Sequence, residues 1–522
     1  MLAFGGGALA AVAATVLWLG DASKPCGHAA ARIAESWGPK QQTAIRSAFA
    51  AAQSPIADDT RERVTAAIDA WTAKWITSQT AACEATHVRH EQSEAALDLR
   101  MRCLERLRAQ LGSFVTTLGE ADAMLVQQAV AATGKLGDVA RCDDVEALAR
   151  MTPMPDDPAI ASRITTLDAG IGQARGLAQA GRFAAARDQA IAIAQEAREI
   201  GYRPLEAEAE YVATITHFSL KEIELAQAAA VRSVTAALAA GDQIGATTAM
   251  VSMCRMVASA GHADEATRCI AIAGGALEHA GSPPALAAVH REAQGLIAFE
   301  RGEHEVGLAA LREAVALREA EGDTGALGNT LHNYGDACRA AGKLDDGEAA
   351  LGRAVALRER LLGPSHPEVA SSLNSLAIVH IEQQRADEAV GELERVLAIR
   401  KATFGPEHDH VAATYNNLGV AYRKGDRCTE AVPMFEQAIA MRGRGLGEDH
   451  FKVAAMRAML AGCKLVLGEL DAAAVLATRA IEGLGDPQLA EDRCDAITTL
   501  AEVHTRKGDA EAAAATRALC VP

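Results

Sequence analysis

Three short stretches decide the fold of this chain: GPSHPEV at residues 363–369, GPEHDHV at 405–411 and GEDHFKV at 447–453. Each begins 42 residues after the one before it. LNSLAIVH at 373–380 and YNNLGVAY at 415–422 lie between these markers, and an alanine-centred second helical segment follows each of them. Self-similarity at a fixed period of roughly 20 to 50 residues is typical of stacked supersecondary units. The chain is therefore predicted to contain a helical repeat array.

The composition also favours helices. The 522-residue chain is 49% hydrophobic but only 3% aromatic, and it is dense in alanine, leucine, glutamate and arginine, which are strong helix formers. Asp and Glu (68) outnumber Lys and Arg (51), so the net charge is −17. An acidic surface repels phosphates, and few aromatics leave few platforms for stacked bases. We therefore predict an all-α protein that does not bind nucleic acid.

The first 20 residues form an uncharged, apolar stretch, MLAFGGGALAAVAATVLWLG. As a helix, residues 2–19 would be about 27 Å long, close to the roughly 30 Å of a bilayer core. Trp18 stands near the end of the stretch, where an amphipathic ring suits a membrane interface. The stretch predicts a transmembrane helix over residues 1–20, which would attach the protein to a membrane. A cleaved signal peptide and a buried core helix are the alternatives.

The repeating units have a characteristic helix-pair pattern. The clearest unit carries, in register, Tyr415, Leu418, Gly419 and Tyr422, then Ala431, Phe435 and Ala438. This pattern resembles the tetratricopeptide repeat (TPR), in the 42-residue form of kinesin-light-chain-like proteins. The resemblance implies a right-handed α-solenoid of helix-turn-helix units, about nine of them over residues 163–522.

A second resemblance covers the segment before the repeats. Residues 21–150 lack the 42-residue period and are predicted to be a helical juxtamembrane domain, and the proline-rich residues 151–162 indicate a linker. The motifs in this segment are, in order, AACEAT (81–86), EQS (91–93), LDLRMRCL (97–104), EAD (120–122) and Cys142. They resemble the region that follows the membrane span in TPR-bearing transmembrane Ser/Thr protein kinases of the myxobacterial type.

The kinase resemblance implies a location and a function. In that family a cytoplasmic kinase domain precedes the span. This chain would then be a sensory or scaffolding half, anchored in the bacterial inner membrane by a single span, with its repeats in the periplasm. It has no glycine-rich loop with a strand lysine, no HRD-type loop and no DFG motif. We therefore predict that it is not an enzyme and that a kinase domain is encoded upstream. A secreted or cytosolic TPR scaffold is the alternative, and a TPR-regulated enzyme is a more remote one.

The eleven cysteines raise the question of disulfides. A helical hairpin that turns at residues 112–113 would bring Cys83 and Cys142 to a similar level, which leaves Cys26 and Cys103 as a second pair. Free thiols are the alternative. The sequence contains no CxxC and no HExxH motif, so no metal or cofactor is predicted. Five further cysteines are expected to fill the repeat core as thiols: Cys254, Cys269, Cys338, Cys428 and Cys463.

Binding in the groove of the array is the remaining candidate function. Register with Tyr415 places three residues at each of two groove positions. Asn can bind an extended peptide backbone and Arg can bind a carboxylate, so a protein or peptide is the predicted partner. Ordinary exposed helix residues are the alternative. The predicted groove residues are His332, Asn374 and Asn416 at the first position, and Arg339, Ile381 and Arg423 at the second.

Two further recurring residue types are expected to be structural. Histidines recur at the 42-residue spacing in the loops between units, which favours a role in loop structure over a shared metal site. Arginines recur at the ends of the second helices, where a cation complements the helix dipole. The two sets are His366, His408 and His450, and Arg318, Arg358, Arg400 and Arg442.

Overall fold

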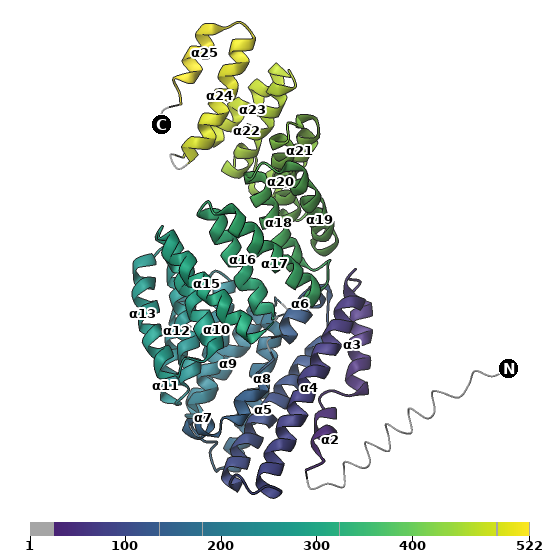
Figure 1. Cartoon of the computed structure of the whole chain (residues 1–522), viewed down its shortest axis with the longest axis vertical. Helices are drawn as coiled ribbons and strands as arrows, with labels where there is room; N and C mark the ends of the chain where they lie inside the picture. The colour runs from purple at the N-terminus through teal and green to yellow at the C-terminus, as the bar shows by residue number, and fades with distance from the viewer. Residues whose placement is uncertain (1–25, 135, 180, 323, 487–488, 521–522) are drawn as a thin grey trace, which may run out of the picture. The chain divides into compact units, whose positions relative to one another are not determined.

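The computed structural model describes residues 26–134, 136–179, 181–322, 324–486 and 489–520. The protein is all-helical, with 82% helix, and this part of the chain contains no strand. The all-α prediction is confirmed. The chain divides into two compact units, the first ending at Ala326 and the second beginning at Leu327 (Figure 1).

The first unit begins with an irregular helical bundle, residues 26–150, called here the N-terminal segment. The indole of Trp75 is 1% exposed and donates a hydrogen bond to the carbonyl oxygen of Leu104 at 2.7 Å. Trp71 donates to the carbonyl oxygen of Gly137 at 2.8 Å. These bonds join elements far apart in the sequence. The elements are α2 (Ala29–Ala34), α3 (Pro39–Ala51), α4 (Ala57–His87), α5 (Glu94–Leu118), α6 (Ala123–Thr133), the 3₁₀ helix η1 (Val139–Asp143) and α7 (Val145–Arg150).

The hairpin of this segment turns at a different place from the one predicted. Helix α5 continues through Gly112, and the chain reverses between His87 and Glu94 instead. Ser93 accepts a hydrogen bond from the backbone N–H of Ala96 and so caps α5. Glycine is tolerated inside a helix that packs on its neighbours, whereas a capping serine marks a helix start.

Four hairpins complete the first unit. Helix α5 packs on the first of them, because Gly172 and Gly176 of α8 approach Ser113 and Thr117 of α5 closely. Arg106 of α5 also forms ion pairs with Asp168 and Glu208. The N-terminal segment and these hairpins therefore share one unit. The hairpins are α8 (Pro158–Gln179) with α9 (Phe183–Ile200), α10 (Arg203–Ser219) with α11 (Ile223–Ala239), α12 (Gln243–Ser259) with α13 (Ala263–His279), and α14 (Pro284–Glu300) with α15 (His304–Glu321).

The second unit contains the most regular repeats. Small residues let paired helices approach: a Cβ on Gly419 would lie 2.7 Å from the ring of Phe435, and one on Gly335 would lie 2.5 Å from Leu351. Five hairpins stack in this way. They are α16 (Gly325–Ala340) with α17 (Leu344–Leu362), α18 (Pro367–Glu382) with α19 (Ala386–Phe404), α20 (Asp409–Lys424) with α21 (Cys428–Leu446), α22 (Phe451–Val466) with α23 (Leu470–Gly483), and α24 (Ala490–Arg506) with α25 (Ala510–Arg517).

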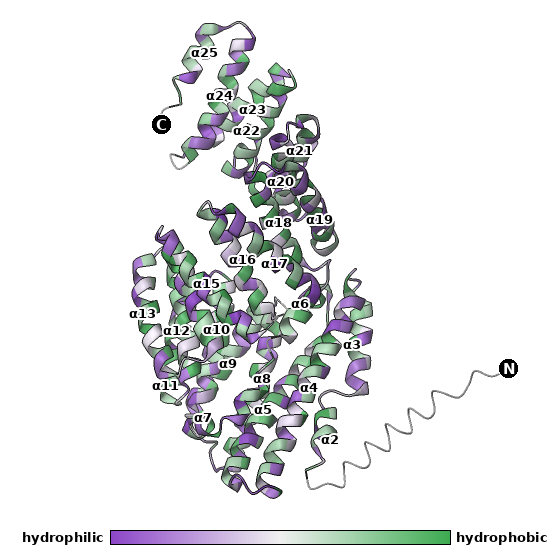
Figure 2. Ribbon diagram, viewed as in Figure 1, coloured by the Kyte–Doolittle hydropathy of each residue, from purple (hydrophilic) through white to green (hydrophobic). Residues whose placement is uncertain are grey.

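The predicted location requires a correction. None of the helices in the described residues combines the length and apolarity needed to cross a bilayer. Hydrophilic residues interrupt the hydrophobic ones along the helices, as packing on one face requires (Figure 2). This finding overturns the prediction of a single-pass inner-membrane protein with periplasmic repeats. The predicted transmembrane helix, residues 1–20, lies outside the described residues.

Candidate functional site

The first helices of the repeats in the second unit present one face to their pairing helices and another away from them. On α20, Gly419 lies against the ring of Phe435 of α21, and Leu418 is buried in a cluster with residues of α18 and α19. Asn416 and Arg423 are seven residues apart and share one side of α20, because positions i, i+3, i+4 and i+7 lie on one helix face, and both side chains are half-buried. We call this side of α16, α18, α20 and α22 the A-helix face.

Asn374 lies on this face but its amide is already used. Its Oδ1 accepts a hydrogen bond from Nδ2 of Asn417 at 3.0 Å and another from Arg400 at 3.4 Å. The first bond joins α18 directly to α20. Asn417 was not predicted; it also accepts a hydrogen bond from Nδ2 of Asn416 at 3.4 Å.

Asn416 and Arg423 are the two predicted residues that retain binding capacity. The Oδ1 atom of Asn416 is buried and has no hydrogen-bond partner in the described part of the chain. The Nε atom of Arg423 is also buried without a hydrogen-bond partner, and the Arg423 guanidinium has no ion-pair partner among the described residues. A buried polar atom without a partner costs about 1 to 3 kcal/mol, so such atoms require an explanation.

The other predicted groove residues have intramolecular partners. Arg339 pairs with Glu382 at 2.9 Å. His332 lies 3.4 Å from Ser372 and 3.4 Å from Asp336, and burial lowers its pKa. Ile381 is buried in the core between repeats, so it cannot line an open groove.

Two of the recurring arginines join successive hairpins. Arg358 is 5% exposed and donates to the Ser372 hydroxyl at 2.5 Å and to the Glu368 carbonyl at 3.0 Å. Arg400 makes the corresponding bonds one period later, to the Thr414 hydroxyl at 2.8 Å and to the backbone of the next helix at 3.2 Å. These bonds are structural, and they act through specific hydroxyls in addition to any helix-dipole effect.

The recurring histidines cap helices. The Nδ1 atom of His366 accepts from the backbone N–H two residues later at the start of α18. His408 and His450 do the same for α20 and α22. No group of three or more His, Cys, Asp or Glu in the described residues is placed to hold a metal ion.

The cysteines pair differently from the prediction. The structure joins Cys26 to Cys83 and Cys103 to Cys142. The four predicted residues are thus all in disulfides, but in pairs other than the predicted Cys83–Cys142 and Cys26–Cys103, because α5 continues through Gly112 where the predicted hairpin would turn. Six more cysteines form disulfides, four of which were expected as core thiols, and Cys338 keeps a buried thiol. The additional disulfides are Cys254–Cys269, Cys428–Cys463 and Cys494–Cys520.

The motifs that carry the kinase resemblance form the frame of the N-terminal segment. Arg100 donates to Gln92 at 3.2 Å and also binds Asp143. Gln92 donates in turn to the Ala82 carbonyl at 2.8 Å. Asp122 caps α6. These motif residues therefore have structural partners within the segment.

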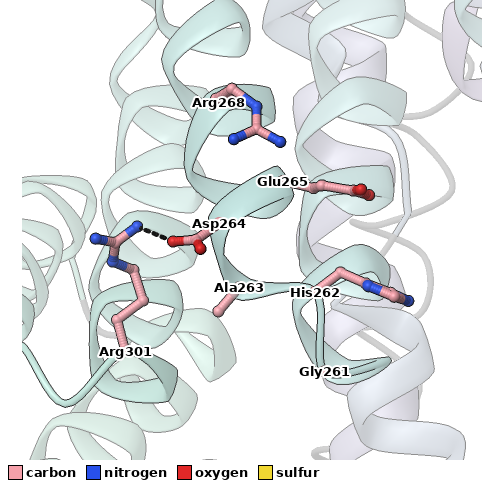
Figure 3. A pocket seen from close by; sticks show the side chains of 7 residues that line it. All are labelled: Gly261, His262, Ala263, Asp264, Glu265, Arg268 and Arg301. Carbon is pink, nitrogen blue, oxygen red and sulfur yellow. Dashed lines mark hydrogen bonds and ion pairs between the residues drawn. The ribbon is translucent and has the colours of Figure 1, made fainter.

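A polar cavity of about 560 Å³ lies beside the turn between α12 and α13. Asp264 turns toward Arg301, with an ion pair of 2.6 Å, while His262 points away from both (Figure 3). The cavity is lined by carboxylate, guanidinium and imidazole groups that are exposed to solvent. Such groups are solvated and gain little from binding one another.

The stacked hairpins and the A-helix face define a helical repeat protein. Residues 326–402, 369–444 and 411–486 match the family model described as tetratricopeptide repeat. Residues 326–486 therefore carry TPR repeats, and the TPR prediction is confirmed for them. The comparison with curated proteins finds no match.

The chain is similar over part of its length to several solved structures, including the following three. TPR-like repeats of a Podosopora anserina kinesin light chain are 24% identical, covering 38% of this chain and 94% of that chain, with a TM-score of 0.35. BtubC from P. vanneervenii is 20% identical, covering 44% and 89%, with a TM-score of 0.35. A Rap protein complexed with Competence and Sporulation Factor is 12% identical, covering 77% and 100%, with a TM-score of 0.43.

Proposed function

We propose that the chain is a protein–protein interaction module that binds an extended peptide segment of a partner on the A-helix face. TPR repeats support this role in general. The observation that carries the specific proposal is the pair of buried atoms on α20 without a hydrogen-bond partner in the described part of the chain, Oδ1 of Asn416 and Nε of Arg423. An amide can both donate to and accept from a peptide backbone, and a guanidinium can bind a carboxylate in a bidentate manner.

The charge of the protein favours an acidic group in the ligand at this point. The chain has a net charge of −17, and Arg423 is half-buried without an ion pair among the described residues. A carboxylate placed against Arg423 would complete its hydrogen bonds. The peptide is thus expected to carry Asp, Glu or a free C-terminus near the backbone segment that binds Asn416.

The test begins with peptides selected from a random library displayed on phage, using the whole chain as bait. A selected peptide is then titrated against the wild type and against Asn416→Ala with Arg423→Ala. Loss of one neutral and one charged hydrogen bond, about 0.5–1.5 and 1.5–3 kcal/mol, predicts at least about tenfold weaker binding. The control is Glu436→Ala with Gln437→Ala, on the exposed side of α21. Equal affinity for all three proteins would contradict the proposal.

We further propose that the partner belongs to a Ser/Thr kinase signalling system. The support is the motif resemblance of residues 81–142 to the kinase-linked region, together with the connected frame that these motifs form. Affinity capture from the source cells with the wild type, compared with the α20 double variant, tests it. Enrichment of a Ser/Thr kinase by the wild type alone supports the proposal, whereas enrichment of unrelated assembly components would favour a scaffold. That the chain itself is not an enzyme stays a prediction.

A further inference from the structure

A second recess lies away from the A-helix face, between α17 and α18. It encloses about 430 Å³, and we call it the α17–α18 pocket. Its lining comprises the small residues Ala349, Gly352 and Ala356 and the charged residues Glu348 and Arg353 of α17, together with Leu376 and His380 of α18. A Cβ on Gly352 would meet no atom within 4 Å among the described residues. The lining is therefore open where the glycine stands.

The next repeat shows what fills the same position when it is occupied. Tyr422 stands 42 residues after His380, and its hydroxyl donates to Glu394 at 3.3 Å. Glu394 is the counterpart of Gly352. The guanidinium of Arg427 lies 4.7 Å from the centre of the Tyr422 ring. In the repeat of α20, the phenol of Tyr422 thus occupies this position. In the repeat before, the shorter imidazole of His380 and the missing side chain of Gly352 leave the corresponding position open.

The polar end of the pocket has an unused hydrogen-bonding group. His380 is 4% exposed. Its Nδ1 lies 3.0 Å from Glu392, while its Nε2 is buried without a hydrogen bond in the described part of the chain, 3.4 Å from Glu348. A hydroxyl group can donate or accept, so it can satisfy Nε2 whichever ring nitrogen carries the proton.

The rim of the pocket limits the charge of a ligand. Arg385, the counterpart of Arg427, donates to Glu348 at 2.7 Å and also pairs with Glu388 at 2.5 Å. The bond from Arg385 holds the pKa of Glu348 down to about 2, so this carboxylate is charged at neutral pH. A neutral phenol is compatible with that carboxylate, whereas a phosphorylated tyrosine would be repelled by it.

We propose that the α17–α18 pocket binds the unphosphorylated side chain of a tyrosine from a partner protein. The ring would lie on Gly352 and Leu376 and the hydroxyl would bond His380 Nε2. This contact is separate from the A-helix face and does not depend on peptide binding there.

The test uses N-acetyl-L-tyrosinamide as the probe and the full chain as the receptor, with saturation-transfer NMR followed by titration. A ligand of this size predicts a dissociation constant on the order of 1 mM. Gly352→Leu places a side chain in the pocket and should weaken binding at least about tenfold. Gly391→Leu is the matched control, because a Cβ there also meets nothing within 4 Å among the described residues and Gly391 does not line the pocket.

Two further comparisons make the result specific. His380→Tyr combined with Gly352→Glu recreates the Tyr422–Glu394 pair and should abolish probe binding while the helical circular dichroism is kept. N-acetyl-phenylalaninamide and the phosphotyrosine analogue should bind more weakly than the tyrosine probe. The proposal is overturned if the wild type shows no binding up to about 10 mM, tenfold above the expected constant. It is also overturned if Gly352→Leu binds as the wild type does, or if the phosphorylated probe binds as well.

Discussion

The N-terminal segment and the repeats of the second unit are both helical, but their helices are held in different ways. In the N-terminal segment a few bonds join distant residues, such as the indole of Trp75 to Leu104 and the disulfide between Cys26 and Cys83. In the repeats, each interface is formed by small and large residues that recur along the chain, such as Gly419 against Phe435. A bundle without a repeat depends on individual contacts, whereas an array distributes its stability over similar interfaces.

The largest expected effect separates these two regions directly. Trp75→Ala removes a buried indole and leaves the Leu104 carbonyl without its bond, which should cost about 3–5 kcal/mol of unfolding free energy. All four tryptophans lie at or before residue 75, so fluorescence reports on the N-terminal part of the chain while circular dichroism reports on all helices. Trp75→Ala should lower the urea midpoint seen by fluorescence.

The matched variant is Phe435→Ala in the second unit. Phe435 is 0% exposed, and its loss should cost a similar amount but lower only the midpoint seen by circular dichroism. Phe404→Ala, at a residue that is 36% exposed, is the control and should cost less than about 1 kcal/mol. If Phe435→Ala shifted the fluorescence transition equally, the two regions would unfold together and the contrast would be wrong.

Removal of a disulfide should lower the unfolding free energy by a slightly smaller amount, which depends on the length of chain that the bond encloses. Cys26 and Cys83 are separated by 57 residues, and Cys254 and Cys269 by 15. The loop-entropy relation predicts losses of about 4 and about 3 kcal/mol for the two Cys→Ala pairs. The measurement is urea denaturation of each double variant. The reverse order would show that native contacts, not loop length, set the contribution of each bond.

Helix capping should have a smaller effect. His408→Ala removes the acceptor for the first turn of α20, at a cost of about 1 kcal/mol. His408→Asp should restore the stability because aspartate is a strong N-cap residue. His262→Ala is the control, since His262 precedes α13 and makes no side-chain cap bond among the described residues. Thermal unfolding of the three variants checks the prediction, and equal losses in His408→Ala and His262→Ala would refute it.

The smallest expected effect is a pH dependence in the second unit. Burial lowers the pKa of His332 below its usual 6.5. The unfolded chain therefore binds a proton more readily than the folded one, and the unfolding free energy falls as the pH drops through 6.5 until the folded pKa is passed. His332→Asn introduces the residue found at the equivalent Asn374 and Asn416, and it should flatten this slope. A slope unchanged in His332→Asn would assign it to other groups, of which His410 also has a lowered pKa from burial.

The repeats could be predicted from the sequence because motifs that recur at the same 42-residue spacing pack in the same way in each hairpin. Gly419 and Phe435 occupy the positions that the pattern gave them, and the TPR family model matches there. The N-terminal segment has no period, so its turn could not be placed by register. Gly112 suggested a turn, but Ser93 caps the start of α5 and the helix continues through Gly112, so the disulfide pairing that assumed a turn there is not the observed one.

The candidate site was predictable as a face but not residue by residue. Register placed Asn374 and Asn416 at equivalent positions, yet Oδ1 of Asn374 accepts from Asn417 and Arg400 while Oδ1 of Asn416 has no partner in the described residues. Such pairing depends on side-chain geometry between helices, which spacing alone does not report. The α17–α18 pocket was not predicted, because the predictions rested on residues that recur between repeats. It arises where the repeat pattern is broken, at His380 and Gly352, and a consensus shows only what recurs.

The contacts that join successive hairpins also determine how the number of repeats encoded by the gene can change. His366 and His408 cap their helices identically, and Arg358 and Arg400 bind a hydroxyl at the same offset, Ser372 in one case and Thr414 in the other. Unequal recombination that deletes the 42 codons of residues 369–410 would join His366 to the segment that begins at Val411 in unchanged register. Arg358 would then meet the hydroxyl of Thr414. The same joint would accept an inserted copy, so the number of repeats can vary between descendants without a new interface having to evolve.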